Sequence, residues 1–263
     1  FANVRRVSQA AADYFQHQQP RTTKKLIVIG FDRRFLSNEF AETVAEVLTG
    51  NGFEVVLSDS SVPTPAVSWL ISKLKGRAGV MITASHNPAR FNGVKLKLHH
   101  GGPADSDTCR NVETLIGQCP VKKVLYEKAH AMKLLKVQNF KARYFNALRK
   151  MVNFKLIATS GLRFAHDALY GVGAGCFEEL LEETNCEVRT FNAEHDPSFG
   201  GICPEPIERN YTSSQAALQT EPANFCLVTD GDADRIGGMD GRGNSLTTHQ
   251  IICLLLEHFL KNR

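Results

Sequence analysis

The sequence lacks the features that mark a metal-stapled, disulfide-bonded or membrane-bound protein. Its seven cysteines are odd in number, and none of them has the Cys-x-x-Cys spacing of zinc sites and redox motifs. No signal peptide opens the chain, and no apolar run is long enough to cross a bilayer. We therefore expect reduced thiols, a cytoplasmic location and no membrane partner.

Long lysine or arginine runs and interleaved aromatic platforms are absent too, although the net charge is +4 and the pI is near 8.7. This pattern argues against nucleic acid as a partner, whereas a small anionic substrate fits it. The composition is ordinary for a soluble globular protein, with 43% hydrophobic and 22% charged residues. A length of 263 residues is enough for two domains that each bury a core.

Apolar runs and helical patterns alternate along the first part of the chain. The run 25–30 is continuous and β-branched and ends in glycine, as in a strand buried on both faces. A helix is expected after Asp105, and the polar, lysine-bearing stretch 122–136 is interpreted as a long loop or irregular connection. The other expected elements here are strands at 53–57 and 78–83 and helices at 37–50, 66–74 and 140–152.

A second series of the same kind follows. A glycine-rich turn, Gly171-Val172-Gly173-Ala174-Gly175, opens a helix that runs to Glu183. The other expected elements are strands at 162–166, 187–191 and 224–229 and helices at 207–218 and across 251–256. The predicted fold is therefore α/β, with two successive three-layer α/β/α domains and mixed, mostly parallel sheets.

The segment Thr83-Ala84-Ser85-His86-Asn87-Pro88 follows a predicted strand, so Ser85 lies where open α/β sheets bind their ligands. A serine hydroxyl is a poor nucleophile unless a neighbour accepts its proton or stabilises the developing charge, which His86 or Lys95 could do. The Asn-Pro and Asn-Gly turns of this loop can bring Lys95 back toward Ser85. The alternative is that these turns only shape a hairpin and that His86 is a solvated loop residue.

The segment Asp230-Gly231-Asp232-Ala233-Asp234-Arg235 carries three carboxylates at alternate positions after another predicted strand. They can converge on one divalent cation if the backbone wraps around it, which Gly231 permits. An EF-hand would need glycine at the sixth position and glutamate at the twelfth, where this chain has Arg235 and Gly241. A haloacid-dehalogenase-type phosphatase would need threonine or valine in place of Asp234. A purely structural turn is disfavoured, because three massed carboxylates repel one another without a cation.

These two segments, in this order, resemble those of the alpha-D-phosphohexomutases, which include phosphoglucomutase, phosphomannomutase and phosphoglucosamine mutase. The serine segment followed by Asn92-Gly93-x-Lys95 is similar to the family's phosphoserine loop, and Asp230–Arg235 to its metal loop. The resemblance covers essentially the whole chain. Further matches are Gly30-Phe31-Asp32-Arg33-Arg34, Pro63-Thr64-Pro65 and Gly200-Gly201-Ile202-Cys203-Pro204-Glu205-Pro206.

The resemblance implies an intramolecular phosphotransferase that interconverts hexose 1-phosphate and hexose 6-phosphate through a phosphoserine enzyme and a bisphosphorylated sugar. Ser85 would carry the phosphoryl group. Asp230, Asp232 and Asp234 would bind Mg²⁺, with a phosphoserine oxygen of Ser85 completing the coordination. Hexose phosphates and hexose bisphosphate are the expected small-molecule partners.

The resemblance also suggests roles for the basic residues of the two segments. Lys95 would transfer a proton or stabilise charge, and His86 would support the serine loop. Arg235 would bind phosphate or sugar oxygens. Arg33 and Arg34 are weaker candidates, because an arginine on a strand-end loop is as often a surface ion-pair partner as a ligand.

The resemblance further divides the chain into a first family domain (1–152), a second (153–246) and the opening helix of a third (247–263). Full family chains have four domains, so we expect a fragment that turns over poorly. Phosphoglucosamine mutase, with the same chemistry on an amino sugar, is the nearest alternative. The others are a non-catalytic module that keeps the fold and a phosphatase in which water attacks the phosphoserine.

Overall fold

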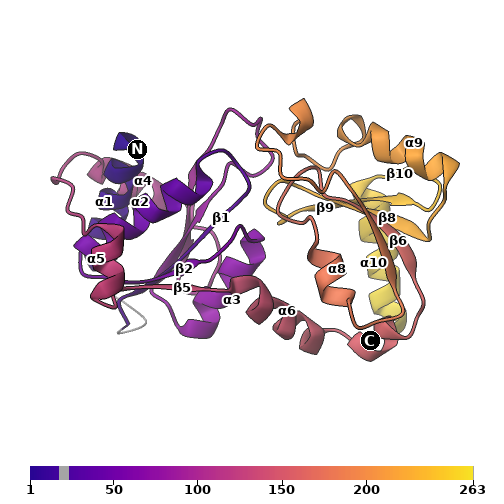
Figure 1. Cartoon of the computed structure of the whole chain (residues 1–263), viewed down its shortest axis with the longest axis horizontal. Helices are drawn as coiled ribbons and strands as arrows, with labels where there is room; N and C mark the ends of the chain where they lie inside the picture. The colour runs from indigo at the N-terminus through magenta and orange to yellow at the C-terminus, as the bar shows by residue number, and fades with distance from the viewer. Residues whose placement is uncertain (18–23, 263) are drawn as a thin grey trace. The chain divides into compact units, whose positions relative to one another are not determined.

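A computed structural model describes residues 1–17 and 24–262 of the chain. The chain forms two compact units, which are drawn in Figure 1. The first unit comprises Phe1–Ala84 and Arg90–Ala147, and the second comprises Ser85–Ala89 and Leu148–Arg263. The short turn Ser85–Ala89 therefore belongs to the second unit, although the chain on either side of it belongs to the first.

A five-stranded mixed sheet forms the centre of the first unit. Its strands are β1 (Leu26–Phe31), β2 (Glu54–Ser58), β3 (Ala78–Ile82), β4 (Val94–Leu98) and β5 (Leu135–Gln138). Their order is β4-β3-β1-β2-β5, with β4 antiparallel to β3 and the other pairs parallel. The apolar run of β1 is buried from Ile27 onward, as expected of a central strand that is covered on both faces.

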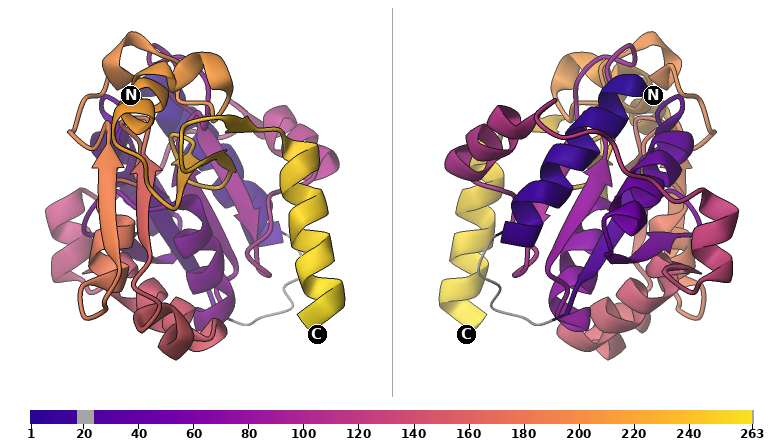
Figure 2. Two further views of the ribbon diagram at one scale, coloured as in Figure 1. Left: turned by 90° about the vertical axis from the view of Figure 1, so that its right-hand side faces the viewer. Right: turned by 90° about the vertical axis from the view of Figure 1, so that its left-hand side faces the viewer.

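Helices cover both faces of this sheet. They are α1 (Ala2–His17), α2 (Ser37–Gly50), α3 (Thr64–Leu74), α4 (Ser106–Leu115), α5 (Tyr126–Ala131) and α6 (Phe140–Met151), which leads into the second unit. On one face, Phe15 of α1 and Leu48 of α2 are fully buried in the same cluster, and Figure 2 shows these two helices side by side. On the other face, Leu70 of α3 packs in a second cluster with Phe140 of α6.

The second unit contains another five-stranded mixed sheet. Its strands are β6 (Arg163–Asp167), β7 (Glu187–Phe191), β8 (Phe225–Thr229), β9 (Ile236–Asp240) and β10 (Ser245–Leu246). Their order is β10-β9-β8-β6-β7. β6 is parallel to β7 and to β8, whereas β9 is antiparallel to both of its neighbours.

Helices flank this sheet as well. They are α7 (Phe154–Ala158), α8 (Cys176–Leu181), α9 (Thr212–Thr220) and α10 (Thr248–Asn262), with 3₁₀ turns η1 (Phe199–Gly201) and η2 (Glu208–Asn210). Leu218 of α9 is fully buried in the core on one face. On the other face, the Phe177 ring of α8 meets Phe164 edge-on, with ring centroids 5.5 Å apart. This arrangement confirms the predicted pair of α/β/α domains.

The terminal helix α10 has no buried residue, a property that it shares only with the much shorter α7 among the α-helices described here. Its leucines face solvent, and Leu260 is 75% exposed. Figure 2 shows α10 in yellow as one long helix after β10. Several exposed apolar side chains gathered on one helix are characteristic of a surface that contacts other protein.

Two sequence expectations are corrected by the structure. The stretch 122–136 is not one irregular connection: it contains α5 and the start of β5, which each contribute one buried apolar residue, Ala129 and Leu135. The helix expected at 207–218 begins as η2 and becomes α9 only at Thr212. The chain leaves the helical region between them at Tyr211, whose side chain is buried in the core.

The sequence reading also missed several elements. The antiparallel strands β4, β9 and β10 and the helices α1 and α7 were not anticipated. β4 carries the alternating pattern Val94-Lys95-Leu96-Lys97-Leu98, which is typical of a strand and was a usable signal. Within the described ranges, every helix is too short or too polar to cross a bilayer.

Candidate active site

The serine turn of the candidate site follows β3. Ser85 lies three residues after Ile82, the last residue of that strand. Its backbone has a φ of 55°, in the left-handed region that disfavours a residue with a Cβ by about 1–2 kcal/mol. Such a conformation persists only where the surrounding structure fixes it, and it is often found at functional sites.

The acidic turn, residues 230–235, connects β8 to β9 and is stabilised by its own first carboxylate. One oxygen of Asp230, Oδ1, accepts the backbone N–H groups of Asp234 and Arg235, both at 3.0 Å. The N–H of Ala233 donates to the Asp230 carbonyl at 3.0 Å. Ala233 has a φ of 52°, so this turn also holds a non-glycine residue in the left-handed region.

Glycines allow other loops of the second unit to pack against the acidic turn. A Cβ on Gly231 would lie 2.7 Å from the Ser85 carbonyl oxygen and 3.0 Å from Pro204. A Cβ on Gly171 would lie 2.9 Å from both the Asp230 carbonyl oxygen and the Gly231 Cα. These distances are too short for a side chain at either glycine. Gly231 therefore allows the serine turn to approach the acidic turn, and Gly171 allows the glycine-rich turn to do the same.

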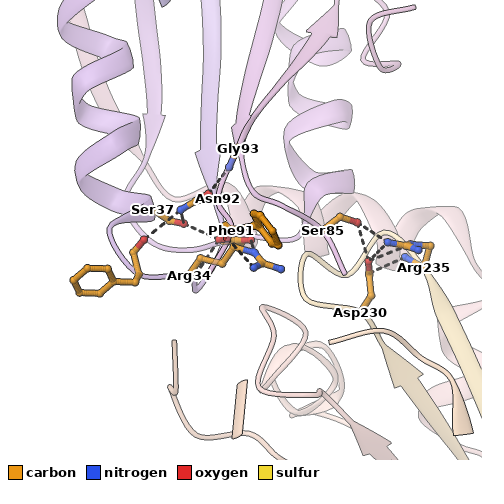
Figure 3. A network of polar contacts seen from close by, with 10 residues as sticks. Arg34, Ser37, Ser85, Phe91, Asn92, Gly93, Asp230 and Arg235 are labelled. Carbon is orange, nitrogen blue, oxygen red and sulfur yellow. Dashed lines mark hydrogen bonds and ion pairs between the residues drawn. The ribbon is translucent and has the colours of Figure 1, made fainter. Parts of the chain in front are cut away.

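The serine hydroxyl and the acidic turn are in direct contact, as Figure 3 shows. Ser85 Oγ donates to Asp230 Oδ2 at 3.2 Å. The Arg235 guanidinium donates from Nη2 to Ser85 Oγ at 2.6 Å and from Nε to Asp230 Oδ2 at 3.2 Å. Nη2 of Arg235 also contacts His86 Nδ1. The hydroxyl therefore lies between a carboxylate and a fixed positive charge.

The three aspartates are close enough to share one cation. One oxygen from each of Asp230, Asp232 and Asp234 lies within 4.8 Å of the others, and the first two residues are fully buried. Burial, and next the nearby Asp232 carboxylate, raise the pKa of Asp230 to about 7. A divalent cation would oppose both causes, because its positive charge stabilises the ionised carboxylates that burial and mutual repulsion disfavour. Carboxylate and hydroxyl oxygens are the donors that Mg²⁺ prefers, so these residues fit a magnesium ion.

The other residues singled out in the sequence lie in the first unit. Lys95 is on β4, where its Cα pairs with Met81 of β3. Arg34 is not a surface ion-pair partner: it is 3% exposed and forms an ion pair with Asp32. Ser85, His86, Arg235 and the three aspartates meet within the second unit, and Lys95 belongs to the other unit.

Sequence reasoning assigned no site role to Asp32 or Gly171. Asp32 was quoted only as part of the motif that ends in Arg34, and Gly171 only as part of a turn that opens a helix. An aspartate directly after a predicted strand and two residues before an arginine was a usable signal for Asp32. The close approach of Gly171 to Asp230 joins residues far apart in the sequence and left no local pattern.

Comparison with known proteins agrees with this description of fold and site. The family description "Phosphoglucomutase/phosphomannomutase, alpha/beta/alpha domain I" matches residues 1–119, and the corresponding domain II matches residues 142–243. The chain belongs to this family, within the alpha-D-phosphohexomutase superfamily.

Individual relatives are identical to this chain at somewhat less than a third of the aligned positions. It is 29% identical to a phosphoglucomutase of Staphylococcus haemolyticus, over 98% of this chain and 49% of that protein. It is 28% identical to a phosphoglucosamine mutase of Prochlorococcus marinus, over 92% of this chain and 52% of that protein. The chain thus spans about half the length of the curated relatives it matches.

A solved structure is similar over nearly the whole chain. This crystal structure from Thermus thermophilus, which is named for phosphomannomutase, has a TM-score of 0.87 and 31% sequence identity. The match covers 99% of this chain and 58% of that one.

Proposed function

We propose that this chain carries the phosphoryl-transfer half of a phosphohexomutase, which interconverts hexose 1-phosphate and hexose 6-phosphate. The observation that carries the proposal is the contact of Ser85 Oγ with Asp230 Oδ2, at the edge of the aspartate cluster. Family membership supports it, because relatives in that family are named as mutases. Ser85 gives its phosphoryl group to one hydroxyl of the sugar monophosphate and later receives the other phosphoryl group of the bisphosphorylated sugar.

Each residue of the site has a role in this proposal. Asp230, Asp232 and Asp234 hold Mg²⁺, together with a phosphoserine oxygen on Ser85. When bound, the ion withdraws electron density from the phosphoryl group and so favours its transfer. Arg235, which already donates to the serine oxygen, is placed to neutralise the charge on phosphate oxygens.

We assign the remaining two residues to orientation and proton transfer. His86 contacts the Arg235 guanidinium and would orient it toward Ser85. Lys95 would supply or accept the proton of the reacting hydroxyl, or stabilise the charge that develops there. Catalysis then rests mainly on positioning and electrostatic stabilisation.

Intact-mass spectrometry after incubation with Mg²⁺ and glucose 1,6-bisphosphate tests the central claim. We expect the protein to gain the mass of one phosphoryl group, and Ser85→Ala to abolish the gain. Ser60→Ala is the matched control, because Ser60 is another serine that donates to an aspartate, Asp59, at 3.0 Å. A Ser85→Ala protein that is phosphorylated as fully as the unaltered one would show that another residue is the carrier.

The same experiment separates the proposal from its alternatives. A non-catalytic module would gain no phosphoryl group. A phosphatase would gain one and release it as inorganic phosphate, whereas a mutase must return it to sugar and exclude water. The amino-sugar alternative, phosphoglucosamine mutase, is supported by a relative that bears this name at nearly the same identity as the phosphoglucomutase. Sugar bisphosphates of glucose, mannose and glucosamine, compared as donors, distinguish these substrates.

The domain division and cellular location are also parts of the proposal. We assign 1–152 and 153–246 to the first two family domains and 247–263 to the opening helix of a third. The exposed leucines of α10 support the last assignment, because a helix without buried residues needs a partner for its apolar surface.

The 263-residue chain should accept a phosphoryl group but turn over slowly, since binding energy from the rest of the substrate positions the reacting hydroxyl. Seven free cysteines are consistent with the cytoplasm.

A further inference from the structure

The loop that carries Ser85 is held by side chains of the first unit on the arm that returns to β4. This loop runs from Thr83, after β3, to Gly93, before β4. The Thr83 N–H donates to the Gly93 carbonyl at 3.0 Å and closes its base. Backbone bonding at the base alone does not determine the course of the residues in between, among which Ser85 has its left-handed backbone.

Arg34 makes the first additional contact with that arm. Its Nη1 donates to the Phe91 carbonyl at 3.0 Å, and its Nε donates to Asp32 Oδ2 at 3.1 Å. Both side chains of this ion pair are fully buried. The planar guanidinium thus binds the β1–α2 connection with one nitrogen and the serine loop with another, as Figure 3 shows for Arg34 and Phe91.

A second set of contacts runs in parallel with the first. Asp32 Oδ1 accepts Ser37 Oγ–H at 2.7 Å, and Ser37 Oγ accepts from Asn92 Nδ2 at 2.9 Å. Asn92 Oδ1 in turn accepts the N–H of Gly93 at 2.8 Å. We call Asp32, Arg34, Ser37 and Asn92 the loop clamp. It joins the start of α2 to two consecutive residues of the loop arm, Phe91 and Asn92.

We infer that the loop clamp is a positioning device for Ser85, which fixes the arm of the serine loop so that the hydroxyl is presented in one orientation. This inference rests on the proposed role of Ser85 as phosphoryl carrier. The alternative is that the buried Asp32–Arg34 pair only stabilises the first unit. Buried ion pairs are weak contributors to stability relative to apolar residues, because desolvation of both charges opposes their attraction. The Arg34 guanidinium also reaches beyond this pair to the Phe91 carbonyl of the serine loop, a contact that the ion pair by itself does not require.

Arg34→Lys distinguishes the two roles in the 263-residue chain. A lysine keeps a positive charge opposite Asp32, but its single ammonium cannot reproduce the fork that reaches both Asp32 and Phe91. We expect the rate of Ser85 phosphorylation by glucose 1,6-bisphosphate, followed by intact mass, to fall about 10- to 100-fold. Urea unfolding of the first unit, followed by fluorescence of the single tryptophan, Trp69, should show a less stable unit that is still folded without urea, so that the rate is measured on folded protein.

Arg77→Lys is the matched control. Arg77 is another arginine of the first unit whose Nη1 donates to a backbone carbonyl, that of Phe15, at 3.0 Å. It has no place in the serine loop, so its replacement should leave the phosphorylation rate unchanged. An equal fall in both variants would mean that loss of any such arginine bond slows the reaction, which contradicts the inference.

A second readout does not depend on phosphorylation. The three-bond HN–Hα coupling and amide shift of Ser85, measured by NMR, report its left-handed backbone. They should move in Arg34→Lys and in Asn92→Ala and stay fixed in Arg77→Lys. If Arg34→Lys does not fold, Asn92→Ala decides the question, because Asn92 is only partly buried. Unmoved Ser85 resonances together with an unaltered rate would overturn the inference. If the unaltered protein accepts no phosphoryl group, the proposed function fails, and the NMR comparison still tests the clamp.

Discussion

The two sheets carry the same four-strand arrangement, but the functional turns that follow their corresponding strands are held in different ways. The orders β4-β3-β1-β2 and β9-β8-β6-β7 correspond, and the fifth strand is added beside β2 in one sheet and beside β9 in the other. In each sheet a parallel strand ends, a turn follows, and an antiparallel strand returns. The turn after β3 presents a hydroxyl, and the turn after β8 presents carboxylates. One topological position thus supplies both halves of the candidate chemistry.

The difference between the turns lies in their length and bracing. The acidic turn spans only 230–235 and is braced by its own Asp230, whose Oδ1 accepts two backbone N–H groups. The serine loop spans 83–93 and is braced from outside, by Arg34 of the β1–α2 connection and by Ser37, the first residue of α2. A short turn can be fixed by its own side chain, whereas a longer loop needs contacts from a neighbouring element.

The largest expected effect comes from removing a carboxylate of the acidic turn. Asp232→Asn should weaken Mg²⁺ binding by about 100-fold or more, since even outer-shell partners of metal ligands contribute about 10- to 100-fold. Isothermal titration calorimetry measures the loss. Asp107→Asn is the control, because this aspartate of the first unit has a side chain that is 82% exposed. Equal Mg²⁺ affinity in the two variants would show that the acidic turn is not the metal site. The contrast between a turn that presents a hydroxyl and a turn that binds a metal would then fail.

Acid should destabilise the second unit through His166. This imidazole is fully buried on β6, where its Nε2 lies 3.0 Å from Thr229 Oγ1. Burial lowers the pKa of His166 to about 4, from an ordinary value of 6.5. Below pH 6.5 the unfolded chain therefore binds a proton that the folded chain does not. The contribution of His166 to stability is intact above pH 6.5 and falls by about 3 kcal/mol as the pH approaches 4.

The variant His166→Gln isolates this effect from other titrating groups. Burial raises the pKa of Asp230 and of Asp167, and both act in the opposite sense, because the folded state binds their protons more readily. The difference in unfolding free energy between the unaltered protein and the variant should shrink between pH 7 and pH 4. Urea unfolding followed by far-UV circular dichroism reports both units, and Trp69 fluorescence reports the first. A difference that is independent of pH would show that His166 is not held neutral.

Sequence reasoning found the features that depend on residues adjacent to one another in the sequence. Ser85 and the three aspartates each stand in a six-residue segment after an apolar strand, so their place at a strand end was readable and is confirmed, whereas their chemistry stays a prediction. The buried runs of β1 and β3 were equally clear, because burial on both faces leaves no polar interruption.

The parts that it missed depend on contacts between distant segments. The partner of Arg34 in the serine loop is Phe91, whose carbonyl carries no information about residue type. The helix α5 has one buried residue, Ala129, which is too little for a periodic pattern. Gly171 leaves room for the Asp230 carbonyl, which belongs to a turn far along the chain, so no neighbouring residue indicates why a glycine is needed there.

Gly171→Ala tests the packing beneath the acidic turn. Its Cβ would lie 2.9 Å from backbone atoms of Asp230 and Gly231, which cannot rotate away. We expect a loss of about 1–3 kcal/mol in stability and about a tenfold loss in Mg²⁺ affinity, as the turn shifts. Gly175→Asn is the control: no atom lies within 4 Å of its added Cβ, and asparagine tolerates the left-handed φ of 75°. If Gly175→Asn disturbs Mg²⁺ binding more than Gly171→Ala does, the close approach is not what matters.

The smallest effect is expected at the strained alanine of the acidic turn. Ala233→Gly should raise the stability of the second unit by up to about 1 kcal/mol, because glycine adopts a φ of 52° without steric conflict. Ala223→Gly, in the same unit at a residue without positive φ, should be destabilising instead, since only the entropy of the unfolded chain increases. Urea unfolding followed by circular dichroism measures both changes.

The comparison with Ser85 explains why that outcome is informative. Ser85 occupies the same backbone region in the serine loop, but there the side chain bears the hydroxyl that we propose as phosphoryl carrier, so glycine would relieve the strain only by removing that hydroxyl. Ala233 presents only a methyl group, so no polar side-chain group is lost when glycine relieves its backbone strain. If Ala233→Gly gains stability while Mg²⁺ affinity falls slightly, the alanine is retained because it stiffens the turn that holds the aspartates. If stability does not rise, the internal bonds of Asp230 already compensate the left-handed backbone, and the two turns differ more in their bracing than in their strain.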